Sequence, residues 1–360
     1  MLPRRILLAA PFALAACGGA AADPTGEANA EMRALLEGFL RRNGDAAGLP
    51  DPPRFRAQAT LAQIAEAAPH VPRHPAGRQE DIAIPTPFGP ALPARLHVPE
   101  GLGERPPLVV FYGHGAWIGG ALDASAPLAH ALAAEAGAML LSVQVRLAPE
   151  HRFPTAHEDA LCAWRWAVRQ AGTLGFDARR MALAGEGSGA NLALATAIAA
   201  RDQYLPRPVA LALGTPMVGS GAESGSMARY AKARPMGAEA VRRALRLMAR
   251  GPRDLMDPRL DPARRAGLSG LPRTAIIAAG IDPLLDESAA LEAALNAAQV
   301  PVRRVVFGGV THGFLGCGAA LHEARLAQRE MAAELRAGLA GVRDPQPVPV
   351  VSRPARVARR

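Results

Sequence analysis

Residues 185–193 read GEGSGANLA, and they join an apolar run, RMALA (180–184), to a helix-like run, NLALATAIAAR (191–201). A strand, a sharp turn and a helix in this order are typical of a nucleophile elbow, G-x-S-x-G, whose central serine is exposed on the turn. Here the central position holds Gly187, and Ser188 stands one place later. The stretch therefore predicts the elbow but leaves its nucleophile open.

Apolar runs alternate with helical patterns on both sides of this turn. The strand-like runs are EDIAIP (80–85), LPARLHVP (92–99), PLVVFY (107–112), AMLLSVQV (138–145), RMALAG (180–185), PVALALG (208–214), RTAIIAAG (273–280) and RRVVF (303–307). Most are separated by helical segments, and another helical pattern follows near 318–340. This alternation predicts an α/β fold, with a mostly parallel sheet and helices on both of its faces.

Residues that could take part in catalysis or binding follow several of these strands. In open α/β sheets, ligands bind at the carboxyl ends of the strands. The loop GHGAWIGG (113–120) follows one strand, IDPLLDE (281–287) follows another, and VTHGF (310–314) follows the last. A glycine-rich loop, an elbow, an acid and a histidine thus arrive in the chain order of a Ser…Asp…His triad with its oxyanion loop ahead of it.

Several motifs resemble one family. Residues 80–340 look like the hormone-sensitive-lipase-like branch of α/β hydrolases, the bacterial esterases of the α/β hydrolase fold-3 kind. The resemblance is carried by LDASAPLAHALAAEAGAMLLSVQVRLAPEHRFPTAHEDALCAWRW (122–166), DPLLDE (282–287) and HGF (312–314). It implies an α/β-hydrolase fold with an eight-stranded, mostly parallel sheet, a helical cap and a pocket for short or medium acyl esters.

The resemblance also implies roles for individual residues. His312 is expected to act as the general base, with Asp282 fixing its tautomer. The backbone N–H groups of Gly115, Ala116 and Ser188 are expected to bind the oxyanion of the transition state. Asp282 has a second structural use, because the proline after it favours the start of a helix.

The elbow departs from the family pattern. The family's G-[DE]-S-A-G-G-N appears as GEGSGAN (185–191), so Gly187 takes the nucleophile's place without any gap. Glycine keeps the turn but supplies no oxygen. Ser188 is the alternative nucleophile. If Ser188 is taken as the central residue of G-x-S-x-G, Glu186 occupies the first glycine position, where an elbow needs a small residue.

Two neighbouring motifs depart as well. The family's H-G-G-G-W appears as GHGAW (113–117), with the histidine one place late or one glycine missing. Its VDYR appears as VQVR (143–146), which loses a polar pair at Gln144 and Val145. Both changes lie near the expected oxyanion loop and set this chain apart from an ordinary esterase.

Three functional hypotheses follow. The chain is an ester hydrolase of reduced or unusual activity, with Ser188 or another route replacing the missing serine. Alternatively, it is a non-hydrolytic pseudo-esterase of the cell envelope that binds a small molecule, or a lipoprotein whose main role is interaction. A dinucleotide-binding interpretation of G-x-G-x-x-A (185–190) is disfavoured, because that motif normally opens the first βαβ unit. We expect no cofactor and no metal.

Composition limits the partners. The chain of 360 residues has 41 Lys and Arg against 32 Asp and Glu, a net charge of +9. No recognition motif and no basic stripe interleaved with aromatic residues accompanies this charge, so nucleic-acid binding is not expected. The sequence leaves open the oligomeric state, and also whether Cys162 and Cys317 form a disulfide.

The first residues resemble an export signal. Residues 1–17 combine Arg4 and Arg5 with a short apolar run, and LAACG (14–18) resembles a bacterial lipobox. We therefore expect a signal peptide, lipidation of Cys17 and an anchored position facing the periplasm. Cleavage near GAAAD (19–23) by an ordinary signal peptidase is the alternative.

The remaining domain boundaries follow from composition. Residues 18–75 are expected to form an N-terminal helical cap and linker, and 76–340 the hydrolase domain. A long interruption at about 215–270 predicts a second cap segment, because insertions of this length commonly form lids. Residues 341–360 read as a disordered basic tail.

Overall fold

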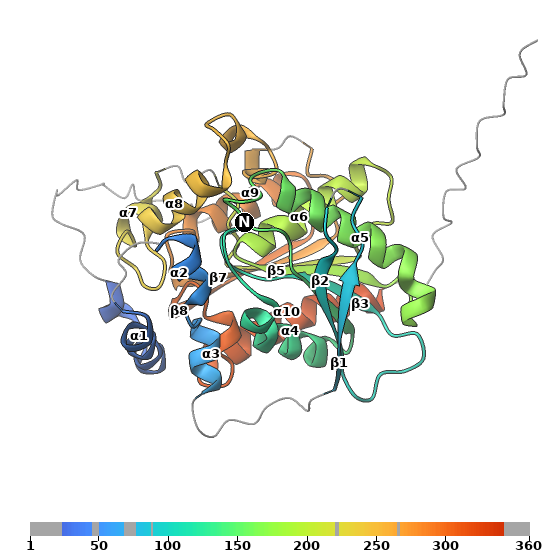
Figure 1. Cartoon of the computed structure of the whole chain (residues 1–360), viewed down its shortest axis with the longest axis horizontal. Coiled ribbons are helices and arrows are strands. Elements are labelled where there is room, and N and C mark those ends of the chain that lie inside the picture. Colours follow the sequence, from blue (N-terminus) through green and yellow to red (C-terminus); the bar gives the residue numbers. More distant parts are fainter. Residues whose placement is uncertain are drawn as a thin grey trace, which may run out of the picture.

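A computed structural model describes residues 24–44, 50–67, 77–87, 89–219, 223–264 and 267–341. One sheet of eight strands forms its centre, with helices on both sides (Figure 1). The predicted signal segment with Cys17, and residues 342–360 of the predicted tail, lie outside the described residues.

The sheet has the strand order β1-β2-β4-β3-β5-β6-β7-β8. Its strands are β1 (Arg78–Ile84), β2 (Leu92–Val98), β3 (Leu108–Tyr112), β4 (Met139–Val143), β5 (Met181–Glu186), β6 (Ala210–Gly214), β7 (Arg273–Ile281) and β8 (Val302–Thr311). The pairs β1–β2 and β2–β4 are antiparallel, and every pair from β4 to β8 is parallel. The predicted eight-stranded, mostly parallel sheet is confirmed.

The central strands are apolar because helices cover both of their faces. All residues of β3, β4, β5 and β6 are buried. Successive side chains of a strand point to opposite faces, so Val109 and Phe111 pack with helices α4 and α10, whereas Val110 and Tyr112 pack with α5 and α6. This two-sided burial explains why these strands appear in the sequence as continuous apolar runs.

The longer helices separate into these two layers. They are α4 (Leu122–Ala136), α5 (Thr155–Leu174), α6 (Ser188–Asp202), α9 (Leu285–Ala297) and α10 (His322–Ala340). Helix α6 is buried along almost its whole length, since it begins at the elbow and runs beneath its neighbours. Short 3-10 helices are η1 (Pro24–Glu27), η2 (Asp254–Met256), η3 (Pro262–Arg264) and η4 (Leu315–Cys317).

The other helices come from the two segments predicted to form a cap. They are α1 (Ala30–Asn43), α2 (Pro52–Ala57) and α3 (Leu61–Glu66) before the sheet, and α7 (Gly225–Arg229) and α8 (Ala238–Met248) between β6 and β7. Asp51 caps α2, and Thr60 with Gln63 forms a capping box on α3. These caps fix short helices that lack the length to be stable alone.

Arg56 of α2 joins the N-terminal segment predicted to form a cap to the domain built around the sheet. Its guanidinium donates to the backbone carbonyl oxygens of Ile118 and Ala148, each at 2.8 Å, and pairs with both carboxylate oxygens of Glu150. Ile118 belongs to the glycine-rich loop after β3, so the cap is tied directly to that loop.

Two further features concern membranes and thiols. Within the described ranges, no helix is both long enough and apolar enough to cross a bilayer. Cys162 and Cys317 are free thiols on separate elements, and Cys317 is buried.

Candidate active site

Asp282 and His312 meet at the carboxyl ends of neighbouring parallel strands. Asp282 directly follows β7 and His312 directly follows β8. The His312 Nδ1–H donates to Asp282 Oδ2 at 2.9 Å. Asp282 is 1% exposed, and its other oxygen accepts from the Leu284 N–H at the start of α9. The acid thus orients the imidazole and holds the turn that leads into α9. The N-cap of that helix is Leu284, so the expected helix start at Asp282 lies two residues too early. Nε2 of His312 is left for chemistry.

The surroundings of His312 shift its pKa upward. Burial by itself lowers the pKa of this imidazole, but the charge and hydrogen bond of Asp282 oppose the effect. The charge of Glu186 and, when it is ionised, that of Glu287 act in the same direction as Asp282, so the net pKa lies above the ordinary 6.5. His312 is therefore a stronger base than a free histidine.

The backbone around Gly187 forms a tight elbow. Gly187 has φ +59° and ψ −119°, a conformation that strains a residue with a side chain. A Cβ on Gly185 would lie 2.2 Å from the Gly189 carbonyl oxygen, and one on Gly189 would lie 2.0 Å from that of Tyr112. Positions 185 and 189 therefore have no room for a side chain, which is the reason that an elbow has small residues on both sides of its centre.

Gly187 itself faces the base. A Cβ built at this position would lie 3.4 Å from Nε2 of His312, an ordinary van der Waals contact, and 3.7 Å from Cβ of His114. A serine here would place its hydroxyl beside Nε2. The structure thus aligns position 187, rather than 188, with His312.

Ser188 is directed elsewhere. It is the first residue of α6 and 4% exposed, and its Oγ accepts from the Trp117 N–H at 3.3 Å. No hydrogen bond joins Ser188 to His312 in the described part of the chain. The hydroxyl instead ties the elbow to the glycine-rich loop, so its role as a nucleophile stays a prediction that this geometry does not favour.

The loop at 113–120 carries the expected oxyanion donors. The N–H groups of Ile118 and Gly119 both donate to the Gly115 carbonyl, at 3.0 and 2.9 Å, which curls the loop tightly. Ala116 and Trp117 adopt positive φ angles of 54° and 60°, uncommon for residues with side chains. Strain of this kind is typical of functional loops.

These donors are available for a ligand. The structure records no hydrogen bond from the N–H groups of Gly115, Ala116 or Ser188 to any described residue. Ser188 opens helix α6, so its N–H also lies at the positive end of a helix dipole. Such groups stabilise negative charge that develops on a carbonyl oxygen.

A second histidine–carboxylate pair lies beside the elbow, and the sequence did not predict it. The His114 Nδ1 lies 3.1 Å from Oε2 of Glu186, which is 1% exposed. The other oxygen, Oε1, has no partner among the described residues. The displaced histidine of GHGAW was the only sequence signal for this pair, because nothing in the spacing predicts that residues 114 and 186 meet.

The elbow is supported from below by polar contacts. The His157 Nε2–H donates to Asn191 Oδ1 at 2.9 Å, and the Asn191 amide donates to the Arg259 carbonyl at the same distance. Arg146 forms a bidentate pair with the buried Asp159, with a shortest distance of 2.6 Å. The RLAPEH (146–151) and HEDA (157–160) motifs supply Arg146, His157 and Asp159 to these contacts. The contacts fix the loop after β4 and helix α5, which explains why both motifs accompany an elbow.

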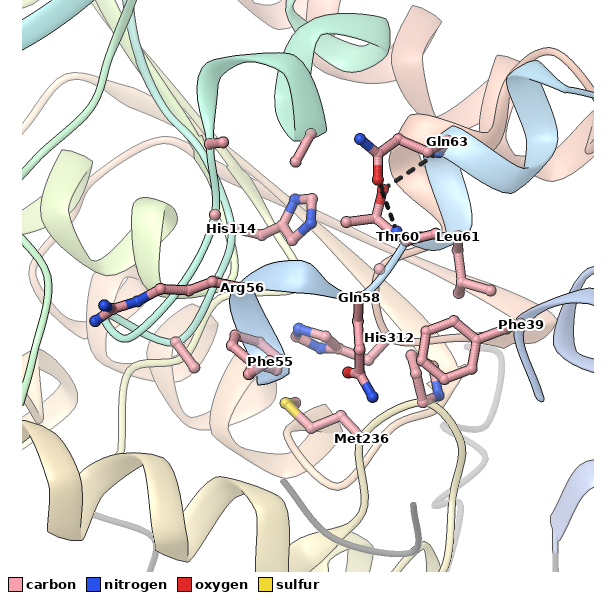
Figure 2. Close-up of a pocket in the computed structure, with 18 of the residues that line it drawn as sticks. Phe39, Phe55, Arg56, Gln58, Thr60, Leu61, Gln63, His114, Met236 and His312 are labelled. Atoms are coloured by element: carbon pink, nitrogen blue, oxygen red, sulfur yellow. Dashed lines mark hydrogen bonds between the residues drawn. The ribbon is translucent and has the colours of Figure 1, made fainter. Parts of the chain in front are cut away.

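A cavity of about 180 Å³ lies above these groups. Its floor contains His114, Ser188 and His312, and its walls are largely apolar (Figure 2). The apolar side chains of the walls are Phe39, Phe55, Leu61, Met217 and Met236. Most of this wall comes from the two cap segments. The described residues hold no group of three or more His, Cys, Asp or Glu that could bind a metal ion.

Comparison with known proteins identifies the family. The profile described as alpha/beta hydrolase fold matches residues 109–316. The ethyl acetate hydrolase of Pseudomonas putida is 36% identical over 250 residues, which cover 68% of this chain and 78% of that protein. An arylesterase of Saccharolobus solfataricus is 31% identical over 288 residues, which cover 79% and 92%.

A solved structure agrees. An esterase of Pyrobaculum calidifontis superposes with a TM-score of 0.77 at 32% identity, over 86% of this chain and 98% of that one. The predicted resemblance to ester hydrolases is confirmed by these matches. The chain belongs to the hormone-sensitive-lipase-like (α/β hydrolase fold-3) family of α/β hydrolases.

Proposed function

We propose that this chain is a carboxylic ester hydrolase for short or medium acyl esters, in which His312 activates a water molecule directly. The observation that carries the proposal is the position of Gly187. Its Cβ would lie 3.4 Å from Nε2 of His312, so glycine leaves room for water where a serine hydroxyl would stand. The hydrogen bond of 2.9 Å between His312 Nδ1 and Asp282 Oδ2 supports these residues as the base and its orienting acid.

The first step is attack on the ester. Nε2 of His312 accepts a proton from water as the water oxygen bonds to the carbonyl carbon. The carbonyl π electrons move to the oxygen, and the N–H groups of Gly115, Ala116 and Ser188 stabilise the resulting oxyanion. Asp282 stabilises the imidazolium that forms.

The second step is collapse of the tetrahedral intermediate. The oxyanion re-forms the carbonyl, the bond to the alkoxy oxygen breaks, and the departing oxygen takes up one proton, which balances the proton that His312 accepted from water. The products are a carboxylic acid and an alcohol, and one water is consumed. No acyl-enzyme forms, because Gly187 has no atom that could carry the acyl group.

The rate should be modest. A positioned general base contributes roughly 10²–10⁴-fold, and oxyanion donors add about 10²–10³-fold each. Covalent catalysis contributes nothing here. We therefore expect turnover well below that of a complete serine triad but clearly above the uncatalysed reaction.

Substrate size follows from the cavity and the relatives. A volume of about 180 Å³ with apolar walls suits small acyl groups. Two relatives are named for ethyl acetate and aryl esters, which supports the same substrate class for this chain.

Hydrolysis of p-nitrophenyl acetate and butyrate tests the proposal. We expect wild-type turnover to fall at least about 10²-fold in His312→Ala, and to fall also in Asp282→Asn, because the imidazole loses its orienting acid. His151→Ala is the matched control, since His151 is exposed. Absence of turnover in the wild type, or equal turnover in His312→Ala, would contradict the proposal.

Gly187 also favours a second candidate, a non-hydrolytic pseudo-esterase that binds a small ester or acid in this cavity. Its signature would be ligand-induced thermal stabilisation without product formation. A rise in the melting temperature with ethyl butyrate, combined with no release of butyrate, would replace the hydrolase proposal with this one.

We further propose export and anchoring through a lipid on Cys17, which would place the domain at a membrane surface facing the periplasm. The support is the basic start, the apolar run and LAACG within residues 1–18. Labelling with an alkyne fatty acid in a bacterial host should mark the wild type but not Cys17→Ala. Labelling of both proteins, or of neither, would count against the anchor.

A further inference from the structure

We propose that His114, oriented by Glu186, is a second catalytic residue that donates a proton to the departing alcohol. The inference rests on the proposed hydrolysis and adds a general acid to it. It places two imidazoles with different tasks on the cavity floor, one for the attacking water and one for the leaving group.

Geometry brings both histidines close to position 187. A Cβ at Gly187 would lie 3.4 Å from Nε2 of His312 and 3.7 Å from Cβ of His114. Both histidines line the same cavity as Phe55 and Leu61 (Figure 2). A tetrahedral intermediate centred beside Gly187 would therefore lie within reach of two rings that come from different elements.

Glu186 gives the His114 ring a fixed orientation. Its Oε2 lies 3.1 Å from Nδ1, so the Nδ1–H donates to the carboxylate and Nε2 is left for the cavity. The arrangement repeats that of Asp282 and His312, where Nδ1 also faces a buried carboxylate at 2.9 Å. Paired carboxylates thus hold both rings by the same atom.

The buried carboxylate gives a second reason for this assignment. Glu186 is 1% exposed, and its Oε1 has no partner among the described residues. A buried carboxylate with so little hydrogen bonding is unfavourable unless a cation lies beside it. The ring of His114 lies beside this carboxylate and compensates its charge when both ring nitrogens carry a proton; its Nε2–H is then the proton to be donated.

Every proton in the proposed reaction is accounted for. His312 gains one proton from the attacking water, and the His114 Nε2–H passes one to the alkoxy oxygen as the bond to the acyl carbon breaks. The excess proton on His312 then leaves to solvent, and solvent returns one to His114. Ester and water become acid and alcohol, with no other reactant.

A separate general acid is particularly useful in an active site that has Gly187 in place of a serine. His312 holds its proton on the side from which water attacked, whereas the leaving oxygen departs from another corner of the tetrahedral carbon. A separate donor removes the need for the imidazole of His312 to serve both positions. His114 is either the family's histidine with one glycine missing after it, or a histidine one place late. In both alignments it lies beside position 187, where this chain lacks a hydroxyl.

Two acetate esters with different leaving groups test the inference. Nitrophenolate leaves readily without a proton, whereas ethoxide does not. We expect His114→Gln to slow ethyl acetate hydrolysis by about 10²-fold, the lower range for a general acid, and p-nitrophenyl acetate hydrolysis far less.

Control variants separate the outcomes. Exposed His151→Gln should affect neither ester, and Glu186→Gln should reproduce the selective loss on ethyl acetate while the protein keeps its thermal unfolding transition. Equal losses on both esters in His114→Gln, or no loss on either, would overturn the acid role while His312-dependent turnover still supported the hydrolase. A wild type that hydrolyses neither ester would overturn the proposed function, and this inference with it.

Discussion

Among single residues, Gly187 has the largest effect on the chemistry proposed for this chain. An active elbow holds a residue with a side chain in a strained conformation, and the glycine at φ +59° relieves that strain. The surrounding glycines and the base keep the geometry that a serine would require. The site is therefore a nearly complete serine hydrolase centre without its oxygen.

Gly187→Ser should restore covalent catalysis. We expect esterase activity to rise because Oγ would lie beside Nε2 of His312, while the free energy of unfolding falls by about 1–3 kcal/mol from backbone strain. Kinetic assays and urea denaturation measure the two effects. Gly187→Ala is the control, with the same strain but no hydroxyl, and an equal gain of activity in both variants would count against this explanation.

His312 sets the acid side of the pH dependence. In the proposed mechanism the neutral imidazole is the base, and its pKa is raised above 6.5 by Asp282 and the nearby carboxylates despite burial. Activity should therefore fall as the pH decreases through a value above 6.5. Asp282→Asn removes the main raising influence and should shift the remaining activity's acid limb downward. An acid limb below pH 6 in the wild type would contradict the raised pKa.

At the scale of elements, helix α2 controls how the cap meets the site. It has only six residues, and Arg56 connects it to two backbone carbonyls and to Glu150. One of these carbonyls belongs to Ile118 in the loop that carries the oxyanion donors. Cap position and loop geometry are thus coupled through one guanidinium.

Arg56→Ala should loosen this connection. We expect a loss of about 1–2 kcal/mol in the free energy of unfolding, since hydrogen bonds to a charged group contribute about 1.5–3 kcal/mol when buried and this side chain is partly exposed. The Michaelis constant for p-nitrophenyl butyrate should rise as the wall of the cavity becomes less fixed. Arg54→Ala, on the exposed side of the same helix, should change neither quantity, and equal effects would argue against the coupling.

The strands were predictable because their apolar runs are short, continuous and separated by turn residues. The strand order was not predicted, since no local pattern shows that β3 lies between β4 and β5. The extension of β8 to Thr311 was not predicted, because Gly308 and Gly309 interrupt the apolar pattern after Phe307. Strand pairing with β7 overrides that local composition.

At the scale of the whole molecule, one buried acid links stability to pH. Part of Glu287 reaches the surface, yet burial of its carboxyl raises the pKa to about 8, with smaller contributions from Asp282 and Asp261. The unfolded chain releases this proton near pH 4.5. The folded state therefore loses stability relative to the unfolded state as the pH rises from about 4.5 to about 8.

Glu287→Gln should remove this penalty. We expect the melting temperature of the variant to exceed that of the wild type by an amount that grows between pH 5 and pH 8. Glu292→Gln, on the same helix and nearer the solvent, is the control and should show no such trend. A difference that stays constant with pH would contradict the buried, protonated state of Glu287.

The candidate site was only partly predictable from the sequence. Asp282 and His312 were identifiable because each follows a strand within a recognisable motif, and the structure brings them together. The direction of the Ser188 hydroxyl and the meeting of His114 with Glu186 were not, because both depend on how a strained loop lies over the elbow. Tertiary packing, not local sequence, sets these contacts.

The most direct test of the account is the intact mass of the protein after exposure to an alkyl fluorophosphonate, together with ester turnover in the same samples. The account predicts that the wild type hydrolyses p-nitrophenyl acetate and stays unmodified, whereas Gly187→Ser gains one adduct at position 187. An adduct on Ser188 in the wild type, lost in Ser188→Ala together with turnover, would show that a displaced serine performs the reaction and would contradict it.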